Sequence, residues 1–352
     1  MKKILQENNL DCLWITNKEN IFYLSKFNGS FGEIIITKEN IYLISDKRYE
    51  KRINDEKLNN INVIILQENE TLFDKLIEIF KKYKNVGFES KDVSYFLYQK
   101  ILNKNINLIP TVDLIENLRL VKKPEEIKNI KKAIEITDKI FTEILMEIKI
   151  GESERDIQKK LDYLINLYAD KKAFDSIVCA NKNTAKPHAN PSDYVIKNGD
   201  ILTLDFGCYI NGYCSDMTRT FFIGKSSDKK LKEIHRIVEE TLNLQIKMIK
   251  PGISVKEIDL VGRKNFQKYG IEKYFVHATG HGIGINVHEK PRISKFSDEK
   301  LIENMVITIE PGIYIPDLGG VRIEQDVLVT KDGFEVLNKS KTSYDVFNNK
   351  KE

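Results

Sequence analysis

The chain has 352 residues, of which 41% are hydrophobic and 31% charged, with 56 Lys and Arg against 52 Asp and Glu. This length exceeds the roughly 250–300 residues at which single cores stop growing, so two domains are expected. Basic and acidic residues are interspersed, which predicts neither a nucleic-acid nor a membrane footprint. The four cysteines form no Cys-x-x-Cys pair, the N-terminus turns polar too early for a signal peptide, and no run of about eighteen apolar residues occurs. We therefore expect a reduced, cytoplasmic protein.

Residues 1–117 are predicted to form a small α/β domain. Short apolar runs such as Ile34–Ile36 and Val63–Leu66 alternate with segments of helical spacing such as Leu72–Tyr83. The domain has no histidine and no cluster of potential ligands, so we expect it to shape a cleft or to mediate assembly. Arg48 follows a predicted strand and is a candidate for reaching the substrate; an ordinary solvated loop is the alternative.

The pattern changes near Leu118, where we place the start of a second domain, residues 118–352. Pro124 followed by two acidic residues is typical of the first turn of a helix, and apolar residues then recur at helical spacing. A second helix is expected near Ser153–Tyr168. A buried strand is expected at Phe174–Ala180.

The stretch Leu202–Thr220 is predicted to form a β-hairpin around an Asn-Gly turn. If the residues flanking the turn pair, Asp205 and Asp216 become diagonal neighbours on one face of the hairpin. Two carboxylates so placed repel each other unless a proton or a cation lies between them, which points to a metal. Two solvated surface Asp residues are the alternative.

Three segments of the second domain recur about a hundred residues later. Ile148–Ile157 matches Ile249–Ile258, His188–Pro191 matches His288–Pro291, and Leu202–Gly207 matches Ile307–Gly312. In the first pair a Gly-x-Ser sequence would end one helix and cap the next. Three ordered matches predict two related halves arranged as a pseudo-twofold duplication.

The duplication makes Asp205 and Glu310 equivalent, and each half adds another carboxylate, Asp216 or Glu324. Four converging carboxylates are too costly to bury without divalent cations. Oxygen-rich ligation suits Mn²⁺ or another hard to borderline ion. We expect two metals roughly 3.5–4 Å apart.

Four of the five histidines lie in or beside these segments, namely His188, His277, His281 and His288. His281 stands between glycines that allow close approach of the backbone, and we predict it as the nitrogen ligand. The other three are expected to orient substrate or move protons, because imidazole titrates near neutral pH.

Other catalytic motifs are missing from the sequence. It contains no His-Glu-x-x-His zinc helix, no Gly-x-Ser-x-Gly elbow and no Gly-x-x-x-x-Gly-Lys phosphate loop. Cys208 and Cys214 lie near the carboxylates, but we interpret both as packing residues.

Six motifs of the second domain resemble the series found in pita-bread metallopeptidases. They are Asp205-Phe206-Gly207, Ser215–Thr220, Gly280–Gly284, Val287-His288-Glu289, Ile309–Gly312 and Gly320–Glu324. Within that group the chain is most similar to Xaa-Pro dipeptidases (prolidases) and Xaa-Pro aminopeptidases. The resemblance implies an α+β fold, with a pita-bread catalytic domain containing a pseudo-twofold duplication. A smaller, creatinase-like α/β domain precedes it. Asn20–Leu24 and Asp46–Tyr49 resemble segments of that domain in the family.

The resemblance also implies an activity and its cofactors. The activity is hydrolysis of Xaa-Pro bonds in proline-containing peptides, through attack by a hydroxide that bridges two divalent ions. The expected ion is Mn²⁺, with Co²⁺ or Zn²⁺ as the alternatives. It places Asp205 on one metal and His281 on the other. Asp216 and Glu324 would bridge them, and Glu310 would act as a ligand and as the base.

The same resemblance gives His188 and His288 contacts with the substrate or the tetrahedral intermediate, and His277 a place in the pocket for the residue before proline. In a dipeptidase Arg292 or Arg322 would bind the free carboxylate of proline, whereas an aminopeptidase needs an open channel there. Holding a ligand carboxylate in place is the role expected of Arg322. We expect a homodimer. The alternatives are a non-catalytic binding protein of this fold and a methionine aminopeptidase-like or creatinase-like enzyme.

Overall fold

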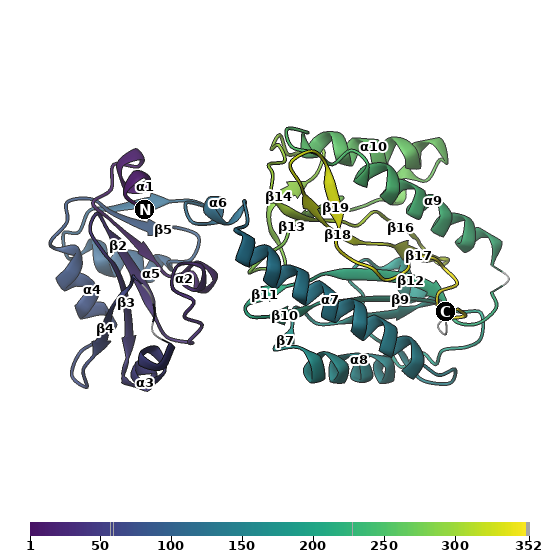
Figure 1. The fold of residues 1–352 in the computed structure, drawn as a ribbon, viewed down its shortest axis with the longest axis horizontal. Helices are drawn as coiled ribbons and strands as arrows, with labels where there is room; N and C mark the ends of the chain where they lie inside the picture. Colours follow the sequence, from purple (N-terminus) through teal and green to yellow (C-terminus); the bar gives the residue numbers. More distant parts are fainter. Residues whose placement is uncertain (57, 59, 227, 350–352) are drawn as a thin grey trace. The chain divides into compact units, whose positions relative to one another are not determined.

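The structure is a computed structural model that describes residues 1–56, 58, 60–226 and 228–349. It divides into two compact units, Met1–Arg119 and Leu120–Glu352 (Figure 1). Within the described ranges, no helix is both long enough and apolar enough to cross a membrane.

The first unit is built on one six-stranded mixed sheet in the order β4-β3-β2-β1-β5-β6. Its strands are β1 (Cys12–Ile15), β2 (Glu33–Thr37), β3 (Ile41–Asp46), β4 (Asn62–Leu66), β5 (Val86–Glu89) and β6 (Leu108–Thr111). Its helices are α1 (Lys2–Glu7), α2 (Lys18–Ser25), α3 (Lys47–Glu56), α4 (Leu72–Phe80), α5 (Tyr95–Leu102) and α6 (Glu116–Arg119). The predicted α/β architecture is therefore confirmed.

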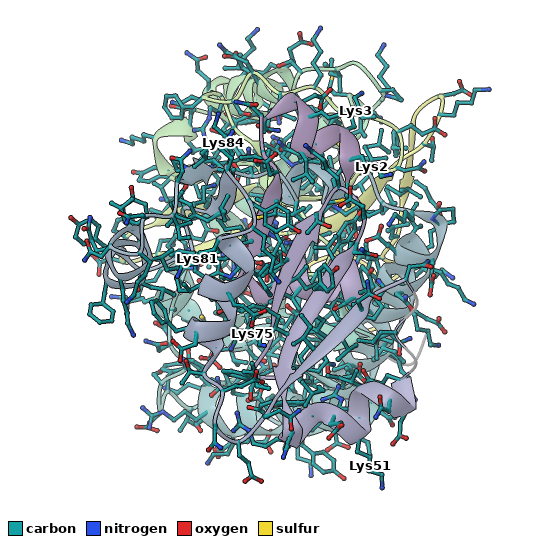
Figure 2. The ribbon with its side chains drawn as sticks, turned by 90° about the vertical axis from the view of Figure 1, so that its left-hand side faces the viewer. Lys2, Lys3, Lys51, Lys75, Lys81 and Lys84 are labelled. Atoms are coloured by element: carbon teal, nitrogen blue, oxygen red, sulfur yellow. The ribbon has the colours of Figure 1, made fainter. Side chains whose placement is uncertain are left out.

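Apolar residues of this unit gather into two clusters, one containing Trp14 and Phe80 and the other containing Leu13 and Phe27. Trp14 and Leu13 are neighbours on β1, so their side chains point to opposite faces of the sheet and into different clusters. The surface carries scattered lysines on several elements, namely Lys2, Lys3, Lys51, Lys75, Lys81 and Lys84 (Figure 2). Lys75 forms ion pairs with neighbouring acids, so charges of both signs alternate there.

The described part of the second unit contains four long helices and a set of short sheets. The helices are α7 (Pro124–Glu147), α8 (Glu154–Tyr168), α9 (Lys229–Ile246) and α10 (Val255–Lys268), with the 3₁₀ turns η1 (Asn181–Ala185) and η2 (Glu272–Tyr274). The first-half strands are β7 (Lys171–Lys172), β8 (Ile177–Ala180), β9 (Ile201–Phe206), β10 (Cys208–Ile210), β11 (Tyr213–Cys214) and β12 (Met217–Phe222). The second-half strands are β13 (Gly280–Gly282), β14 (Glu289–Ile293), β15 (Val306–Ile309), β16 (Gly312–Ile315), β17 (Gly319–Arg322), β18 (Gln325–Val329) and β19 (Phe334–Val336).

The helices of this unit enclose its strands from two sides, with α7 and α8 on one side and α9 and α10 on the other (Figure 1). One core joins α7 and α8 to β9 and β12, and a second joins α9 and α10 to β15 and β18. The layered arrangement places the carboxylate-bearing strands between the two helix pairs.

The predicted start of α7 is confirmed. Pro124 occupies the first helical turn, where its missing N–H is not needed, and Glu126 Oε2 accepts a hydrogen bond from the backbone N–H of Lys123 at 2.9 Å. The second predicted helix also forms, beginning after the N-cap Ser153.

The duplication is visible in the backbone. Gly151 and Gly252 both have positive φ angles, +97° and +87°, at the helix ends that precede α8 and α10. Ser153 and Ser254 then cap these helices through their side chains. Each of the two serines also forms an isolated β-bridge to a later segment of its own half. The two halves therefore share one design.

The first hairpin keeps the predicted register on both sides of its Asn-Gly turn. Asn211 and Gly212 have φ angles of 52° and 79°, as a type I′ turn requires. The hairpin is divided at Gly207, where a Cβ would lie 1.9 Å from the carbonyl oxygen of Ser215. The absence of a side chain at Gly207 lets the two chains cross closely at the point where the carboxylates begin.

All four cysteines are free and buried. Burial raises the pKa of the Cys12 and Cys179 thiols to about 12. Cys208 Sγ donates a hydrogen bond to the Ala133 carbonyl, and Cys214 Sγ to the Gly284 carbonyl. They are packed thiols, not exposed ones.

Candidate metal centre

The second hairpin brings two glutamates face to face. Gly312 pairs with Arg322, two residues along each strand from these carboxylates. Glu310 therefore lies directly opposite Glu324, and the same register continues into β15 and β18. Directly opposed residues on one face of a hairpin have Cβ atoms roughly 4.5–5.5 Å apart. The backbone register thus places the Cβ atoms of the two glutamates close together.

The first hairpin places its carboxylates differently. Asp205 pairs with Thr218, and Asp216 lies two residues before Thr218, on the diagonal predicted from the sequence. In the duplicated frame, Thr218 is thus the counterpart of Glu324, and Asp216 is the counterpart of Arg322. The longer second turn, which has three residues between its paired ends where the first has two, accounts for one residue of this difference in spacing. The rest arises because the second carboxylate stands two positions further along its strand than Asp216 does.

His281 lies on β13 and faces the same carboxylates. Its Nε2 is 3.5 Å from Glu310 Oε1 and 3.7 Å from Asp216 Oδ2. Its Nδ1 is 3.0 Å from the Gly282 carbonyl, which assigns the proton to Nδ1 and leaves the Nε2 lone pair free for a cation. His281, Asp216 and Glu324 each offer a ligand atom, and these atoms all lie within 4.8 Å of one another.

The electrostatics of the cluster require a compensating charge. Burial, reinforced by Glu324, raises the pKa of Asp216 and of Glu310 well above their usual ranges. Burial, reinforced by Asp205, raises the pKa of Glu324 to about 7. Glu324 Oε1 is buried and has no hydrogen-bond partner among the described residues. An acceptor left open in a crowded anionic pocket fits divalent cations, which replace the protons that the carboxyls would otherwise retain.

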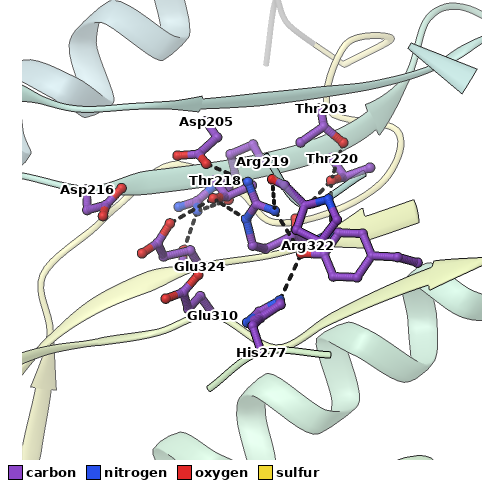
Figure 3. A network of polar contacts seen from close by, with 12 residues as sticks. Thr203, Asp205, Asp216, Thr218, Arg219, Thr220, His277, Glu310, Arg322 and Glu324 are labelled. Atoms are coloured by element: carbon purple, nitrogen blue, oxygen red, sulfur yellow. Dashed lines mark hydrogen bonds and ion pairs between the residues drawn. The ribbon is translucent and has the colours of Figure 1, made fainter. Parts of the chain in front are cut away.

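Arg322 joins the two halves at this site (Figure 3). Arg322 Nη2 lies 2.5 Å from Asp205 Oδ2, and Arg322 Nε donates to Thr218 Oγ1 at 3.0 Å. Arg322 Nη1 donates to the Tyr314 hydroxyl at 2.7 Å, which in turn lies 2.9 Å from His277 Nε2. A continuous chain of polar contacts thus runs from Asp205 to His277.

Comparison with known proteins assigns the chain to a family. Residues 128–331 match the model of metallopeptidase family M24, and residues 1–121 match the creatinase/prolidase N-terminal domain. The chain belongs to metallopeptidase family M24. The predicted α+β fold is thereby confirmed, with a smaller α/β domain that precedes the duplicated catalytic domain in the sequence. The M24 family implies divalent metal ions.

Several known proteins align with this M24 chain over almost its whole length. A Xaa-Pro dipeptidase of Pyrococcus furiosus is 38% identical over 343 residues, which cover 96% of each chain. A solved Xaa-Pro dipeptidase from Bacillus anthracis has a TM-score of 0.93 at 37% identity, covering 97% of this chain and 96% of that one. A solved X-Pro aminopeptidase from Thermotoga maritima has a TM-score of 0.89 at 34% identity, covering 97% and 99%.

The other three predicted histidines are linked to residues of the M24 carboxylate cluster or to one another. The His288 ring is exposed and packs edge-on against His281, with ring centroids 4.3 Å apart. His277 is half-buried, and burial together with Arg322 lowers its pKa to about 3. His188 is exposed. The pKa of His277 is lowered first by burial and Arg322 and then by the charge of His188, and the pKa of His288 is lowered first by burial and then by the charge of His188. Protonation of His188 therefore disfavours protonation of the other two rings.

The remaining predicted residues lie at the margins. Arg292 is exposed on β14 and occupies the register position opposite His281. Arg48 begins α3 of the first unit with its neighbour Lys47, and its Nη2 pairs with Asp46 at 2.7 Å. The structure thus brings Arg292 to the strand beside the cluster and gives Arg48 a local partner in its own unit.

Asp326 and Tyr314 are among the polar residues of the site that were not predicted. Asp326 is fully buried beside the cluster, where its Oδ2 accepts from the backbone N–H of Asp216 at 3.3 Å. Tyr314 links Arg322 to His277, as described above. Both could have been found, because alternation along a strand puts Asp326 on the same face as Glu324, and Tyr314 on the same face as Glu310.

Proposed function

We propose that this M24 metallopeptidase hydrolyses Xaa-Pro bonds in peptides with two divalent cations. Asp205, Asp216, His281, Glu310 and Glu324 would hold the ions. The observation that carries the proposal is the convergence of these side chains from both halves into one buried, strongly anionic cluster. Several similar proteins bear the names Xaa-Pro dipeptidase and X-Pro aminopeptidase, which supports the choice of substrate.

Four carboxylates and one imidazole favour a hard to borderline ion, so we propose Mn²⁺, with Co²⁺ or Zn²⁺ as substitutes. When bound, such ions supply Lewis acidity toward the scissile carbonyl and a nucleophile at neutral pH. Asp205 would serve one ion and His281 the other, with Asp216 and Glu324 shared between them.

The protein's own residues handle the protons. Glu310 would accept a proton from the attacking water, and His288 or His188 would stabilise the developing negative charge. Proline's nitrogen carries no hydrogen in the peptide, so it leaves only when a proton is delivered to it. One of these two histidines, both exposed beside the cluster, would deliver that proton.

His277 would line the pocket for the residue before proline. Its lowered pKa keeps the imidazole neutral throughout the working range of pH. Its Nδ1 lies 2.7 Å from the Ala278 carbonyl, and its Nε2 contacts the Tyr314 hydroxyl. With both nitrogens so engaged, the ring offers a fixed wall to the substrate.

We propose dipeptidase rather than aminopeptidase specificity. Arg292 is exposed opposite His281, where it would pair with the free carboxylate of proline. Arg322 would instead hold Asp205, since its guanidinium already contacts Asp205, Thr218 and Tyr314.

We also propose a cytoplasmic homodimer. Four free, buried cysteines fit a reducing compartment. The first unit brings no histidine, which fits a role in assembly or in shaping a cleft. Light scattering on a sizing column measures the oligomeric state directly.

The decisive test removes the metal with EDTA and then adds Mn²⁺, Co²⁺ or Zn²⁺ separately. Reloaded protein should hydrolyse Xaa-Pro dipeptides, cleave Xaa-Pro-Yaa poorly and leave Xaa-Ala largely intact. Elemental analysis should recover about two ions per chain. Equal cleavage of Xaa-Pro-Yaa would contradict the dipeptidase assignment, and a metal-loaded protein that cleaves neither proline substrate would refute the peptidase proposal.

A further inference from the structure

A buried carboxylate outside the cluster has no role in the chemistry above. Glu154 is the first residue of α8, and none of its surface is exposed. Its Oε1 accepts from the Ala180 backbone N–H at 2.5 Å. Its Oε2 accepts from the Ser192 backbone N–H at 2.6 Å, from Ser192 Oγ at 2.7 Å and from Asn183 Nδ2 at 2.9 Å. One carboxylate therefore organises four donors.

These donors lie at the two ends of one segment, residues 180–192, which we term the His188 loop. Glu154 contacts the start of the loop at Ala180 and its end at Ser192, and so ties the ends to α8. Hydrogen bonds to an ionised acceptor are roughly twice as strong as neutral ones, and the start of a helix also favours a negative charge. The carboxylate is thus well suited to fix the loop.

The fold itself does not require a carboxylate at this position. In the second half, the first residue of α10 is Val255, which is fully buried in the core. Glu154 N–H donates to the Tyr194 carbonyl, and Val255 N–H donates to the Glu299 carbonyl in the same way. The backbone frame is the same, so the acidic side chain serves something found only in the first half.

The His188 loop reaches the candidate site. Arg322, which contacts Asp205, also donates from Nη1 to the Pro187 carbonyl at 3.1 Å. His188 follows directly, and its charge acts on His277 and His288. A loop whose middle lies at the site and whose ends are tied elsewhere can transmit the effect of a remote contact to one side chain.

We infer that Glu154 is a positioning residue that acts through His188, holding the His188 loop so that this imidazole meets the substrate. The inference rests on the proposed function for its kinetic consequence. It extends that function to a residue about which the metal cluster gives no indication.

The kinetic test is a double-mutant cycle of Glu154→Gln and His188→Ala on metal-loaded protein. Glutamine keeps the size of the side chain, but its amide NH₂ meets N–H or O–H donors in place of an acceptor oxygen. We expect Glu154→Gln to lower kcat/KM for an Xaa-Pro dipeptide by about tenfold to a hundredfold. In the His188→Ala background the same change should cost less than about twofold, because the residue through which it acts is gone.

The matched control is Asp156→Asn, in the same first turn of α8. Asp156 makes an exposed cap contact with Ser153 and none of the loop contacts described above. Its substitution should lower the melting temperature slightly and leave kcat/KM within about twofold of the parent. A loss of activity in this variant equal to that of Glu154→Gln would assign the effect to α8 stability and overturn the inference.

A spectroscopic readout separates this inference from the proposed function. In the NMR spectrum of protein with isotope-labelled histidine rings, the His188 resonance is identified by its loss in His188→Ala. Glu154→Gln should shift or broaden that signal and leave the signal of His235, buried on α9, unchanged. This holds even for protein that cleaves no proline peptide, so the two proposals fail independently.

Ser192→Ala provides a milder variant should Glu154→Gln fold poorly. It removes one donor and leaves the carboxylate and the Ser192 backbone N–H in place. We expect a smaller shift of the His188 signal and a loss of kcat/KM in the same direction. An unchanged His188 signal in both variants, or additive kinetic losses in the cycle, would overturn the inference.

Discussion

The two hairpins of the second unit share a frame but carry different chemistry. In the first, Asp205 faces Thr218, and Asp216 lies on the diagonal. In the second, Glu310 and Glu324 face each other directly. The first half thus offers short carboxylates spread along its face, whereas the second offers long carboxylates at one level.

The counterpart of Asp216 shows what this asymmetry achieves. Arg322 occupies that position in the second half and reaches across to Asp205 in the first. Two copies of the first hairpin would bring the same number of carboxylates to the centre but would lack the arginine that contacts Asp205. The duplication therefore supplies a symmetric scaffold, and substitution at matched positions converts it into a site with distinct roles on its two sides.

The strongest way to break the comparison is Asp216→Asn. It keeps the size of the side chain but removes a charge that both ions would share. We expect kcat/KM to fall by more than the roughly 10–100-fold typical of residues that only support a ligand. Metal content per chain should fall as well, measured by elemental analysis. Unaffected cleavage would exclude the two-metal arrangement.

The matched change in the other half is Arg322→Met, which should cost less. It frees Asp205 from its partner, and we expect a loss of roughly 10–100-fold in kcat/KM with weaker metal affinity, measured by titrating metal into EDTA-treated protein. Arg236→Met, on exposed α9 ion pairs, is the control and should change neither quantity. A rise in KM for dipeptides with unchanged metal affinity would instead place Arg322 on the substrate.

The metal-free protein should show the smallest of these effects, as a dependence of its stability on pH. Glu324 has a folded pKa of about 7 against 4.5 for the free side chain, chiefly from burial and then from Asp205. The folded state therefore binds this proton more tightly, so the contribution of Glu324 to stability should fall as pH rises from about 4.5 to about 7. The raised pKa values of Asp216 and Glu310 act in the same direction.

Melting temperatures at several pH values, with EDTA and with Mn²⁺, measure this dependence. Mn²⁺ should remove the fall, because cations replace the protons, and Glu324→Gln should make the metal-free fall shallower. Parallel curves with and without metal would show that the cluster does not bind the ion.

Much of the fold could be predicted because local signals agreed with the tertiary structure. The Asn-Gly turn set the hairpin register, and Pro124 marked the start of α7. Boundaries were less accurate: the strand expected from Phe174 begins at Ile177, and the helix expected to reach Tyr83 ends at Phe80. The break at Gly207 also escaped prediction, because it depends on the close approach of the Ser215 carbonyl.

The site was predictable to the extent that motifs recur between the halves. The matched pair Asp205 and Glu310 follows from the repeat alone. The correspondence of Asp216 with Arg322 does not, because it depends on a turn that is one residue longer in the second half. The hydrogen bonds between Glu154 and the His188 loop join segments separated by α8 and the two short strands β7 and β8, and no local pattern in the sequence encodes that contact.

The burial of every thiol has a practical consequence for studying this protein. Burial makes all four thiols inaccessible and raises their pKa values. Little reactive thiolate is therefore present in the folded protein. A single cysteine introduced on the exposed face of α8, for example at Tyr163, would be the preferred target of a maleimide dye in the folded protein. A fluorophore can thus be attached at a chosen position without first replacing the native cysteines.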